Sequence, residues 1–218
     1  MPPRVRHPGA ASFVPVGADL GGLAAALGGC LGCDIGANGT TPVFGVGAGD
    51  ARVVLVGEQP GDQEERRGTP FVGPAGQLLD RALDEAGIDR AQTWVTNAVK
   101  HFKFQTVTYT KRRIHQSPDT AEVVACRPWL AAELNVLRPE LVVVLGATAA
   151  KALLPSTYRV TRDRGQVFDG PAGSGARVIG TIHPSAVLRA PDETRDEAFA
   201  GLVADLRVAA GLLTASET

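Results

Sequence analysis

Short apolar runs alternate along the chain with longer segments whose apolar residues recur at helical spacing. The runs at residues 52–56, 93–99, 141–145 and 178–182 are mainly apolar. Runs of this length without regular polar alternation indicate strands buried on both faces. Because these strands alternate with helical segments, we predict a parallel sheet covered by helices on both faces. The expected fold is α/β, a three-layer α/β/α arrangement with a central, mostly parallel, four-stranded sheet.

Capping residues place the helices between these strands. We predict helices over residues 20–27, 74–86, about 119–138, from 146 onward, and 195–212. Asp19 can cap the first of them, and Gly87 follows the second, as expected at helix starts and ends. Residues 1–16 are expected to form a loose tail. Residues 154–176 carry little signal. We expect residues 162–165 to be a solvated loop, with a position near bound nucleic acid as the alternative.

Length and composition bound the class of protein. The 218 residues are enough for one domain with a full core, so residues 1–218 are expected to form a single domain. The longest apolar stretch, residues 141–150, is far shorter than the roughly 20 residues of a spanning helix, and the N-terminus lacks a signal-peptide pattern. We expect a soluble monomer with no membrane partner, cytoplasmic in a bacterium and associated with the nucleoid.

Charge is unevenly distributed. The net charge is −1, which excludes a generally basic nucleic-acid-binding surface, yet no acidic residue lies between Asp89 and Asp119. That interval contains six Lys or Arg residues and two of the four histidines. A local positive face suits contact with a few phosphates. A solvated surface loop is the alternative interpretation.

Polar motifs follow several of the predicted strands, where ligands bind in parallel sheets. They are residues 57–62 (GEQPGD), 70–73 (PFVG), 111–115 (KRRIH) and 183–185 (HPS), with 146–151 (GATAAK) after the third strand. Together and in this order they resemble the uracil-DNA glycosylase superfamily. Family 4 of that superfamily typically has Ala at the position of Gln59. The GEQPG and KRRIH segments instead resemble the UdgX type, whose members become covalently trapped on the DNA they attack.

The resemblance implies a substrate and a pocket. The substrate would be uracil-containing DNA, with single strands favoured because an unpaired base costs less to extrude, and free uracil would be released. Phe71 would stack on the base and Asn97 would read its edge, beside the turn formed by Gly57 and Gly61. Taken alone, Phe71 could equally be a core residue and Asn97 a strand-end cap.

The remaining motifs would supply the chemistry and the DNA contacts. A hydrogen bond from His183 would stabilise the negative charge that develops on the leaving uracil. Ser185 would cap the following helix or touch a phosphate, and phosphate contacts are expected from Lys111, Arg112 and Arg113.

Two routes are open for attack on the sugar. In an ordinary member of the superfamily a polar residue of the first turn positions water, and Glu58, Gln59 and Asp62 lie in that turn. In the UdgX type the loop histidine attacks C1′ and stays bonded, which makes His115 the nucleophile and Glu58 the group that orients or deprotonates it. His115 could instead be a DNA-backbone contact. The alternatives are therefore a turning-over family 4 enzyme and a non-catalytic iron–sulfur protein that binds single strands.

The three cysteines suggest a metal centre. Cys30 and Cys33 form a C-x-x-C pair, and Cys126 is distant in sequence. Family 4 enzymes hold a [4Fe–4S] cluster with four cysteines, one of them at the position occupied here by His101. The resemblance therefore implies a structural cluster held by Cys30, Cys33, His101 and Cys126, a ligand set compatible with the histidine ligation of Rieske centres. Zinc on the same four residues is the main rival, and three free thiols are the other alternative.

Overall fold

The computed structural model describes residues 8–171 and 174–214, and its centre is a six-stranded mixed sheet. The strands, in spatial order, are β1 (Val46–Gly47), β3 (Thr93–Asn97), β2 (Val53–Gly57), β6 (Leu141–Leu145), β8 (Arg177–Thr181) and β7 (Val167–Asp169). The four inner strands are parallel. Val53 of β2 lies opposite Leu141 of β6, and Leu145 of β6 lies opposite Thr181 of β8. They confirm the mostly parallel α/β prediction.

The prediction of four strands omitted the two edges of the sheet. β1 and β7 pair antiparallel to β3 and β8, and they contain only two and three residues. Both are partly or fully exposed. Such short, exposed strands have no apolar run, and tertiary pairing alone defines them.

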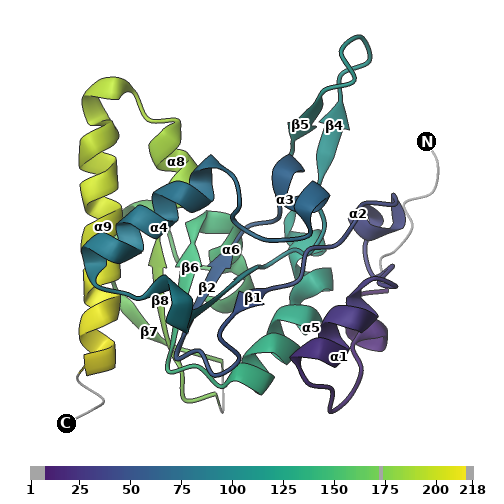
Figure 1. Ribbon diagram of the computed structural model, residues 1–218, viewed down its shortest axis with the longest axis horizontal. Helices are drawn as coiled ribbons and strands as arrows, with labels where there is room; N and C mark the ends of the chain where they lie inside the picture. The colour runs from purple at the N-terminus through teal and green to yellow at the C-terminus, as the bar shows by residue number, and fades with distance from the viewer. Residues whose placement is uncertain (1–7, 172–173, 215–218) are drawn as a thin grey trace.

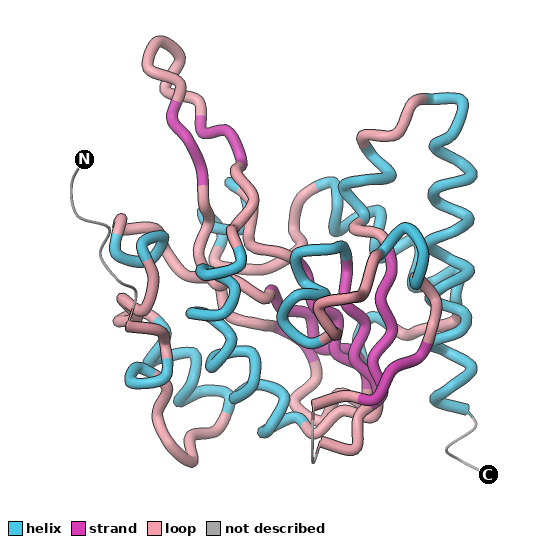
Figure 2. Tube along the Cα trace, turned by 180° about the vertical axis from the view of Figure 1, so that it is seen from behind, coloured by secondary structure: helices cyan, strands magenta, loops and turns pink. Residues whose placement is uncertain are grey.

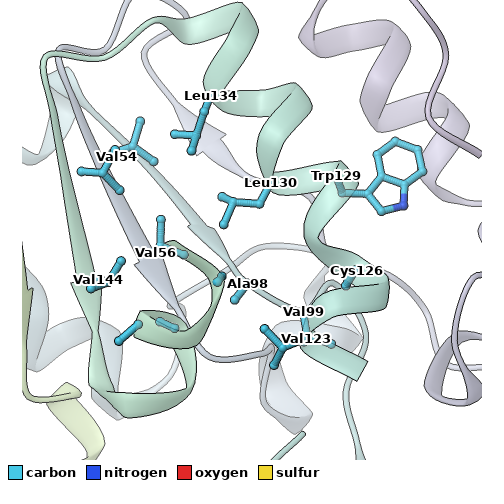
Figure 3. Packing of buried hydrophobic residues seen from close by; sticks show 14 of the residues in the cluster. Val54, Val56, Ala98, Val99, Val123, Cys126, Trp129, Leu130, Leu134 and Val144 are labelled. Atoms are coloured by element: carbon cyan, nitrogen blue, oxygen red, sulfur yellow. The ribbon is translucent and has the colours of Figure 1, made fainter. Parts of the chain in front are cut away.

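Alternate residues of each inner strand face two separate helical layers. On one face Val54, Val56, Val142 and Val144 pack with α1 (Leu20–Leu27), α5 (Thr120–Leu137) and α6 (Gly146–Leu153), as Figure 3 shows for part of this cluster. On the other face Val53, Leu55, Leu141 and Val143 pack with α4 (Pro74–Ala86), α8 (Pro184–Leu188) and α9 (Asp192–Thr214). Helices α4 and α9 lie side by side in Figure 1. Burial on both faces explains why these strands are continuously apolar.

The helix predictions hold closely. Helices α1 and α4 have the expected bounds, whereas α2 (Asp34–Ala37) and α3 (Asp62–Arg67), which lie between them in sequence, were not predicted. Asp119 caps α5 by accepting a hydrogen bond from the Glu122 N–H at 2.9 Å. Helix α9 is longer than predicted at both ends. No helix among the described residues is both long and apolar enough to cross a membrane.

Two predictions about irregular segments were wrong in part. Residues 1–7 of the expected tail lie outside the described residues, but Ala10 is buried and its N–H donates to the Ala125 carbonyl at 2.8 Å. Residues 162–165 are not simply a solvated loop, because α7 (Val160–Asp163) ends there and Asp163 is buried. Arg164 pairs with Asp205 at 2.7 Å. Buried polar contacts, which local sequence does not reveal, anchor both segments.

A two-stranded hairpin stands out from the body of the molecule. It consists of β4 (Phe104–Thr106) and β5 (Arg113–His115), and Figures 1 and 2 both show it projecting beyond the helical layers. The short helices α2 and α3 lie toward its base in Figure 1. The sequence analysis did not predict the hairpin as an element, although the KRRIH motif lies in it.

Candidate active site

A cavity of about 700 Å³ opens at the carboxyl ends of the inner strands. Its lining includes residues that directly follow or end β2, β3, β6 and β8: Glu58, Gln59, Asn97, Gly146 and His183. Phe71, His115, Thr148 and Ser185 complete the part of the wall that concerns the chemistry. Parallel strands bring their carboxyl ends to one edge of a sheet, so motifs far apart in sequence meet there.

Glu58 and His115 are in contact in the wall of the cavity. The Oε1 atom of Glu58 lies 3.3 Å from Nε2 of His115, and the two side chains are 20% and 49% exposed. Burial alone would raise the pKa of Glu58, but hydrogen bonds with His115 and Thr148 outweigh it, and the pKa is lower than its ordinary value. Glu58 is therefore a carboxylate at neutral pH, able to orient the His115 ring and to balance positive charge on it.

His183 is held as a neutral hydrogen-bond donor. The N–H of Ser185 donates to Nδ1 of His183 at 3.1 Å, and the Ser185 hydroxyl lies 2.8 Å from the same atom. Because Nδ1 accepts, the proton of a neutral ring must be on Nε2. Burial lowers the pKa of His183 to about 4; the charge of Glu58 opposes this shift, and the charge of Arg189 adds to it. The imidazole thus offers one N–H without carrying a charge at neutral pH.

Phe71, Asn97 and Gly57 come together in one corner of the cavity. The Phe71 ring stacks on the His183 ring, with centroids 5.8 Å apart and planes inclined by 25°. A Cβ atom on Gly57 would lie 2.4 Å from Oδ1 of Asn97 and 2.6 Å from the Phe71 ring. The turn therefore requires glycine at residue 57 if both side chains are to keep their places.

Phe71 has a strained backbone. Its φ of 56° is in the left-handed region, which costs a non-glycine residue about 1–3 kcal/mol. Glu64 braces the segment, because its carboxylate accepts hydrogen bonds from the N–H groups of Gly73 and Gly61 at 2.9 and 3.1 Å. The sequence analysis missed Glu64, although its position three residues after Gly61 at a helix start was an available capping signal.

Gln59 joins the cavity to the base of the hairpin. Its Nε2 donates to the carbonyls of Lys103 and Gln116 at 3.1 Å each, and its Oε1 accepts from the Lys103 N–H at 3.0 Å. The side chain is buried, and these three bonds tie together the two chain segments that enter and leave the hairpin. In this structure Gln59 holds backbone in place, and its amide is occupied in doing so.

Arg113 and Asp62 bind the hairpin to α3. The guanidinium of Arg113 pairs with Asp62 and Glu65 and lies 4.8 Å from the centroid of the Phe104 ring. Asp62 does not line the cavity. Lys111 and Arg112 are exposed near the hairpin tip. Among the residues that the structure describes, neither pairs with a carboxylate, whereas Arg113 pairs with two.

A buried ion pair supports the strand end that carries Asn97. Lys100 and Glu133 are both fully buried, and Nζ of Lys100 lies 2.6 Å from Oε2 of Glu133. The same ammonium donates to the Asn97 carbonyl at 2.9 Å and to the Thr96 hydroxyl at 2.6 Å. A buried charge with this many partners fixes the local backbone, because loss of any partner leaves a desolvated group unpaired.

The three cysteine sulfurs are buried, and each accepts an N–H. Trp129 Nε1 donates to Cys30 at 3.2 Å, and the Lys100 backbone N–H donates to Cys126 at 3.3 Å. Burial raises the pKa of Cys33, with backbone hydrogen bonds from Gly36 and Ile35 opposing the rise. Burial also raises the pKa of Cys126, to about 12, so the N–H groups only partly offset desolvation and both thiols keep their protons at neutral pH; a bound metal would have to displace those protons.

His101 presents a bare nitrogen in the same region. Its Nδ1 lies 3.0 Å from the Thr40 carbonyl, which can only accept, so the proton is on Nδ1. Its Nε2 is buried and has no hydrogen-bond partner. A Cβ on Gly36 would lie 3.1 Å from that nitrogen. A histidine that donates one N–H to a carbonyl and leaves the other nitrogen free has the form of a metal ligand.

The α/β fold with a cavity at its strand ends is the arrangement of a ligand-binding α/β protein, and comparison with known proteins identifies the family. Residues 44–207 match the uracil DNA glycosylase superfamily. A type-4 uracil-DNA glycosylase of Thermotoga maritima is 37% identical over 161 residues, covering 73% of this chain and 78% of that protein. The corresponding enzyme of Archaeoglobus fulgidus is 34% identical over 173 residues, covering 77% and 82%.

A third relative, a type-4 uracil-DNA glycosylase of Pyrobaculum aerophilum, is 38% identical over 144 residues, covering 64% of this chain and 69% of that protein. The chain belongs to the uracil DNA glycosylase superfamily. This membership confirms the predicted superfamily and, with it, the predicted class of enzyme, a uracil-DNA glycosylase. The roles of individual residues stay predictions.

Proposed function

We propose that this enzyme excises uracil from DNA and stays covalently joined to the deoxyribose through His115. One observation carries the covalent step: the His115 ring lies in the cavity, 3.3 Å from the Glu58 carboxylate. Phe71, Asn97 and His183 line the same cavity. A base held by these three side chains would bring its sugar toward the Glu58–His115 pair.

The reaction divides between the two histidines. As the C1′–N1 bond breaks, its electron pair goes to the uracil ring, and Nε2–H of neutral His183 donates a hydrogen bond to the oxygen that gains charge. The sugar is left as an oxocarbenium ion. A neutral nitrogen of His115 then forms the new bond to C1′, and the positive charge that the ring gains is balanced by Glu58. No water is consumed, and uracil leaves as the anion until it takes a proton from solvent.

The rival route uses water. If Glu58 activated a water molecule, the products would be uracil and a free abasic site, as in a conventional enzyme. Removal of the imidazole should open that route, because the space it leaves can admit water beside Glu58. We therefore expect His115→Ser to release uracil without forming an adduct.

The test is a denaturing gel. Purified protein is incubated with a labelled uracil-containing single-stranded oligonucleotide, boiled in SDS and separated. A slow, heat-stable band that requires uracil is the expected result, and it should disappear in His115→Ser but persist in Thr106→Ala, a change at an exposed residue of the same hairpin. Fast abasic product alone from the wild type would overturn the covalent step and leave a conventional glycosylase. No change to the oligonucleotide would favour the binding-protein alternative.

We also propose a structural [4Fe–4S] cluster held by Cys30, Cys33, His101 and Cys126. Three observations support it: each sulfur accepts an N–H, Nε2 of His101 is bare, and both His101 and Cys126 are buried. Such a cluster would join the C-x-x-C segment to α5 and to the segment after β3. No chemical step is assigned to it.

Zinc remains the rival for these residues. Within residues 8–171 and 174–214 no three Cys, His, Asp or Glu side chains converge as ligands of one ion do, whereas a cluster distributes its ligands over several iron atoms. Iron and zinc should be quantified in protein purified without oxygen, together with its visible absorbance. About four iron atoms per chain in the wild type would support the cluster, and His101→Cys should retain the same iron content. One zinc per chain without iron would overturn it.

We propose single-stranded DNA as the preferred substrate. The net charge of −1 and the short basic interval fit contact with few phosphates. An unpaired uracil also avoids the cost of breaking a base pair. Comparison of adduct formation on one oligonucleotide, alone and annealed to its complement, tests this preference.

A further inference from the structure

The tip of the hairpin carries an aromatic side chain that has no structural role in the described part of the molecule. Tyr109 is 97% exposed, so it contributes almost nothing to a core. It lies in the loop between β4 and β5, at the part of the molecule that projects farthest from the helical layers (Figures 1 and 2). Both faces of the ring are therefore open to solvent.

Positive charge accompanies the ring. Lys111 and Arg112 follow it within the same loop, and both are exposed. Within the described residues neither of them pairs with a carboxylate, whereas Arg113 pairs with Asp62 and Glu65. Cationic side chains beside an exposed aromatic ring are the combination that binds single-stranded nucleic acid, in which phosphates meet the charges and bases stack on the ring.

The hairpin also connects this tip to the reacting position. His115 is at its base, paired with Phe104, and Gln59 clamps the segments that lead into it. Six residue steps lead from His115 to Tyr109, which at ~3.3 Å per residue is at most about 20 Å of ribbon. A strand whose sugar reaches His115 and that follows the hairpin would therefore arrive at Tyr109 within a few nucleotides.

We propose that Tyr109 stacks on an unpaired base of the substrate strand, a few nucleotides from the uracil, and so supplies affinity for single-stranded DNA. This inference rests on the proposed function and adds a substrate contact to it. The ring needs an open base face, which a duplex does not present. Lys111 and Arg112 hold the adjacent phosphates and keep the strand along the hairpin.

The test separates binding from chemistry. The equilibrium constant for an undamaged single-stranded oligonucleotide is measured by fluorescence anisotropy for wild type, Tyr109→Ala and Tyr109→Phe, with Thr108→Ala as the exposed neighbouring control. Loss of one base stack should raise Kd about tenfold in Tyr109→Ala. Tyr109→Phe and Thr108→Ala should stay within about twofold of wild type, because the face of the ring makes the contact.

Uracil release is then followed with a uracil-containing strand. At limiting DNA, Tyr109→Ala should be slower by the same factor as its loss of affinity, and at saturating DNA its rate should equal that of wild type, because Glu58, His115 and His183 are untouched. Placing the uracil opposite a mismatch inside a duplex should remove most of the difference between Tyr109→Ala and wild type.

Failure of the stacking proposal and failure of the proposed function would give different results. Wild-type affinity in Tyr109→Ala would overturn the stacking contact and leave uracil excision intact. An equal loss of affinity for DNA with paired and with unpaired flanks would also overturn it, because the contact would then be to the DNA backbone. An equal loss of affinity in Tyr109→Phe would overturn it as well, because the contact would then be made by the hydroxyl. If wild type released no uracil, the proposed function would fail, while the binding comparison would still decide the role of Tyr109.

Discussion

The Oε1 atom of Glu58 lies 3.3 Å from Nε2 of His115, and the two residues come from different structural units. Glu58 follows the central strand β2, whereas His115 ends the outlying hairpin. The contact exists because Gln59, the residue after Glu58, holds the base of that hairpin through three hydrogen bonds. One turn of the chain thus supplies both a carboxylate and the clamp that brings its partner to it.

Replacing Glu58 by Gln should slow adduct formation by a factor of about 10²–10⁴, the usual contribution of an acid–base group. The amide keeps the shape of the side chain but cannot balance the charge that His115 gains. Single-turnover gels with excess enzyme measure the rate. Glu85→Gln, at an exposed position of α4, should react like wild type. A wild-type rate in Glu58→Gln would mean that the carboxylate takes no part in the covalent step.

The low pKa of His183 makes stability depend on pH. Unfolded protein takes up a proton on this residue below about pH 6.5, whereas the folded protein does so only as pH approaches about 4. Protonation therefore favours the unfolded state across this window, and stability is lost as pH falls. Between pH 7 and 5 the wild type should lose about 1–2 kcal/mol more of its unfolding free energy than His183→Asn does.

Urea unfolding of both proteins at the two pH values measures that difference. His101, whose pKa burial also lowers, is present in both proteins, so its contribution cancels. Equal losses in wild type and His183→Asn would show that His183 titrates normally in the folded protein.

Gln59→Ala should change the fate of the sugar more than the release of uracil. Without its three hydrogen bonds the hairpin base loosens, His115 is held less well, and water competes for the sugar cation. We expect a larger share of free abasic product relative to adduct, quantified on the same denaturing gel. Gln63→Ala is the matched control, because it makes the same substitution at an exposed position of α3. A similar shift in both variants would argue against the clamp.

Gly57→Ala should abolish most uracil release. Its Cβ would come within 2.4 Å of Oδ1 of Asn97 and 2.6 Å of the Phe71 ring, so at least one of the side chains proposed to hold the base must move. We expect a loss of more than about 10²-fold, since small displacements of positioning groups cost this much. Gly211→Ala, at a helical position where a Cβ meets nothing within 4 Å, should retain full activity.

Local signals were sufficient for the framework of the fold. The strands of the parallel centre are apolar because they are buried on both faces, and the caps at Asp19, Asp119 and Gly87 mark helix ends through backbone hydrogen bonds made within a few residues. Edge strands, the hairpin and the anchoring of Ala10 were not predictable in this way. The partners of β1 and Ala10 are distant in sequence, whereas β7 and the hairpin strands pair with nearby segments but are too short and exposed to carry a pattern.

For the site, the amino-acid sequence by itself determined which residue types are present and that several of them follow strands of a parallel sheet. That order was enough to predict the superfamily. Only the tertiary structure decided which role each side chain has. Gln59 and Asp62 hold the hairpin, and Arg113 pairs with carboxylates. Glu64 accepts hydrogen bonds that brace the turn of Phe71. The reason is physical, because a side chain's role depends on which groups lie within hydrogen-bond reach, and that distance is set by the packing of segments far apart in the chain.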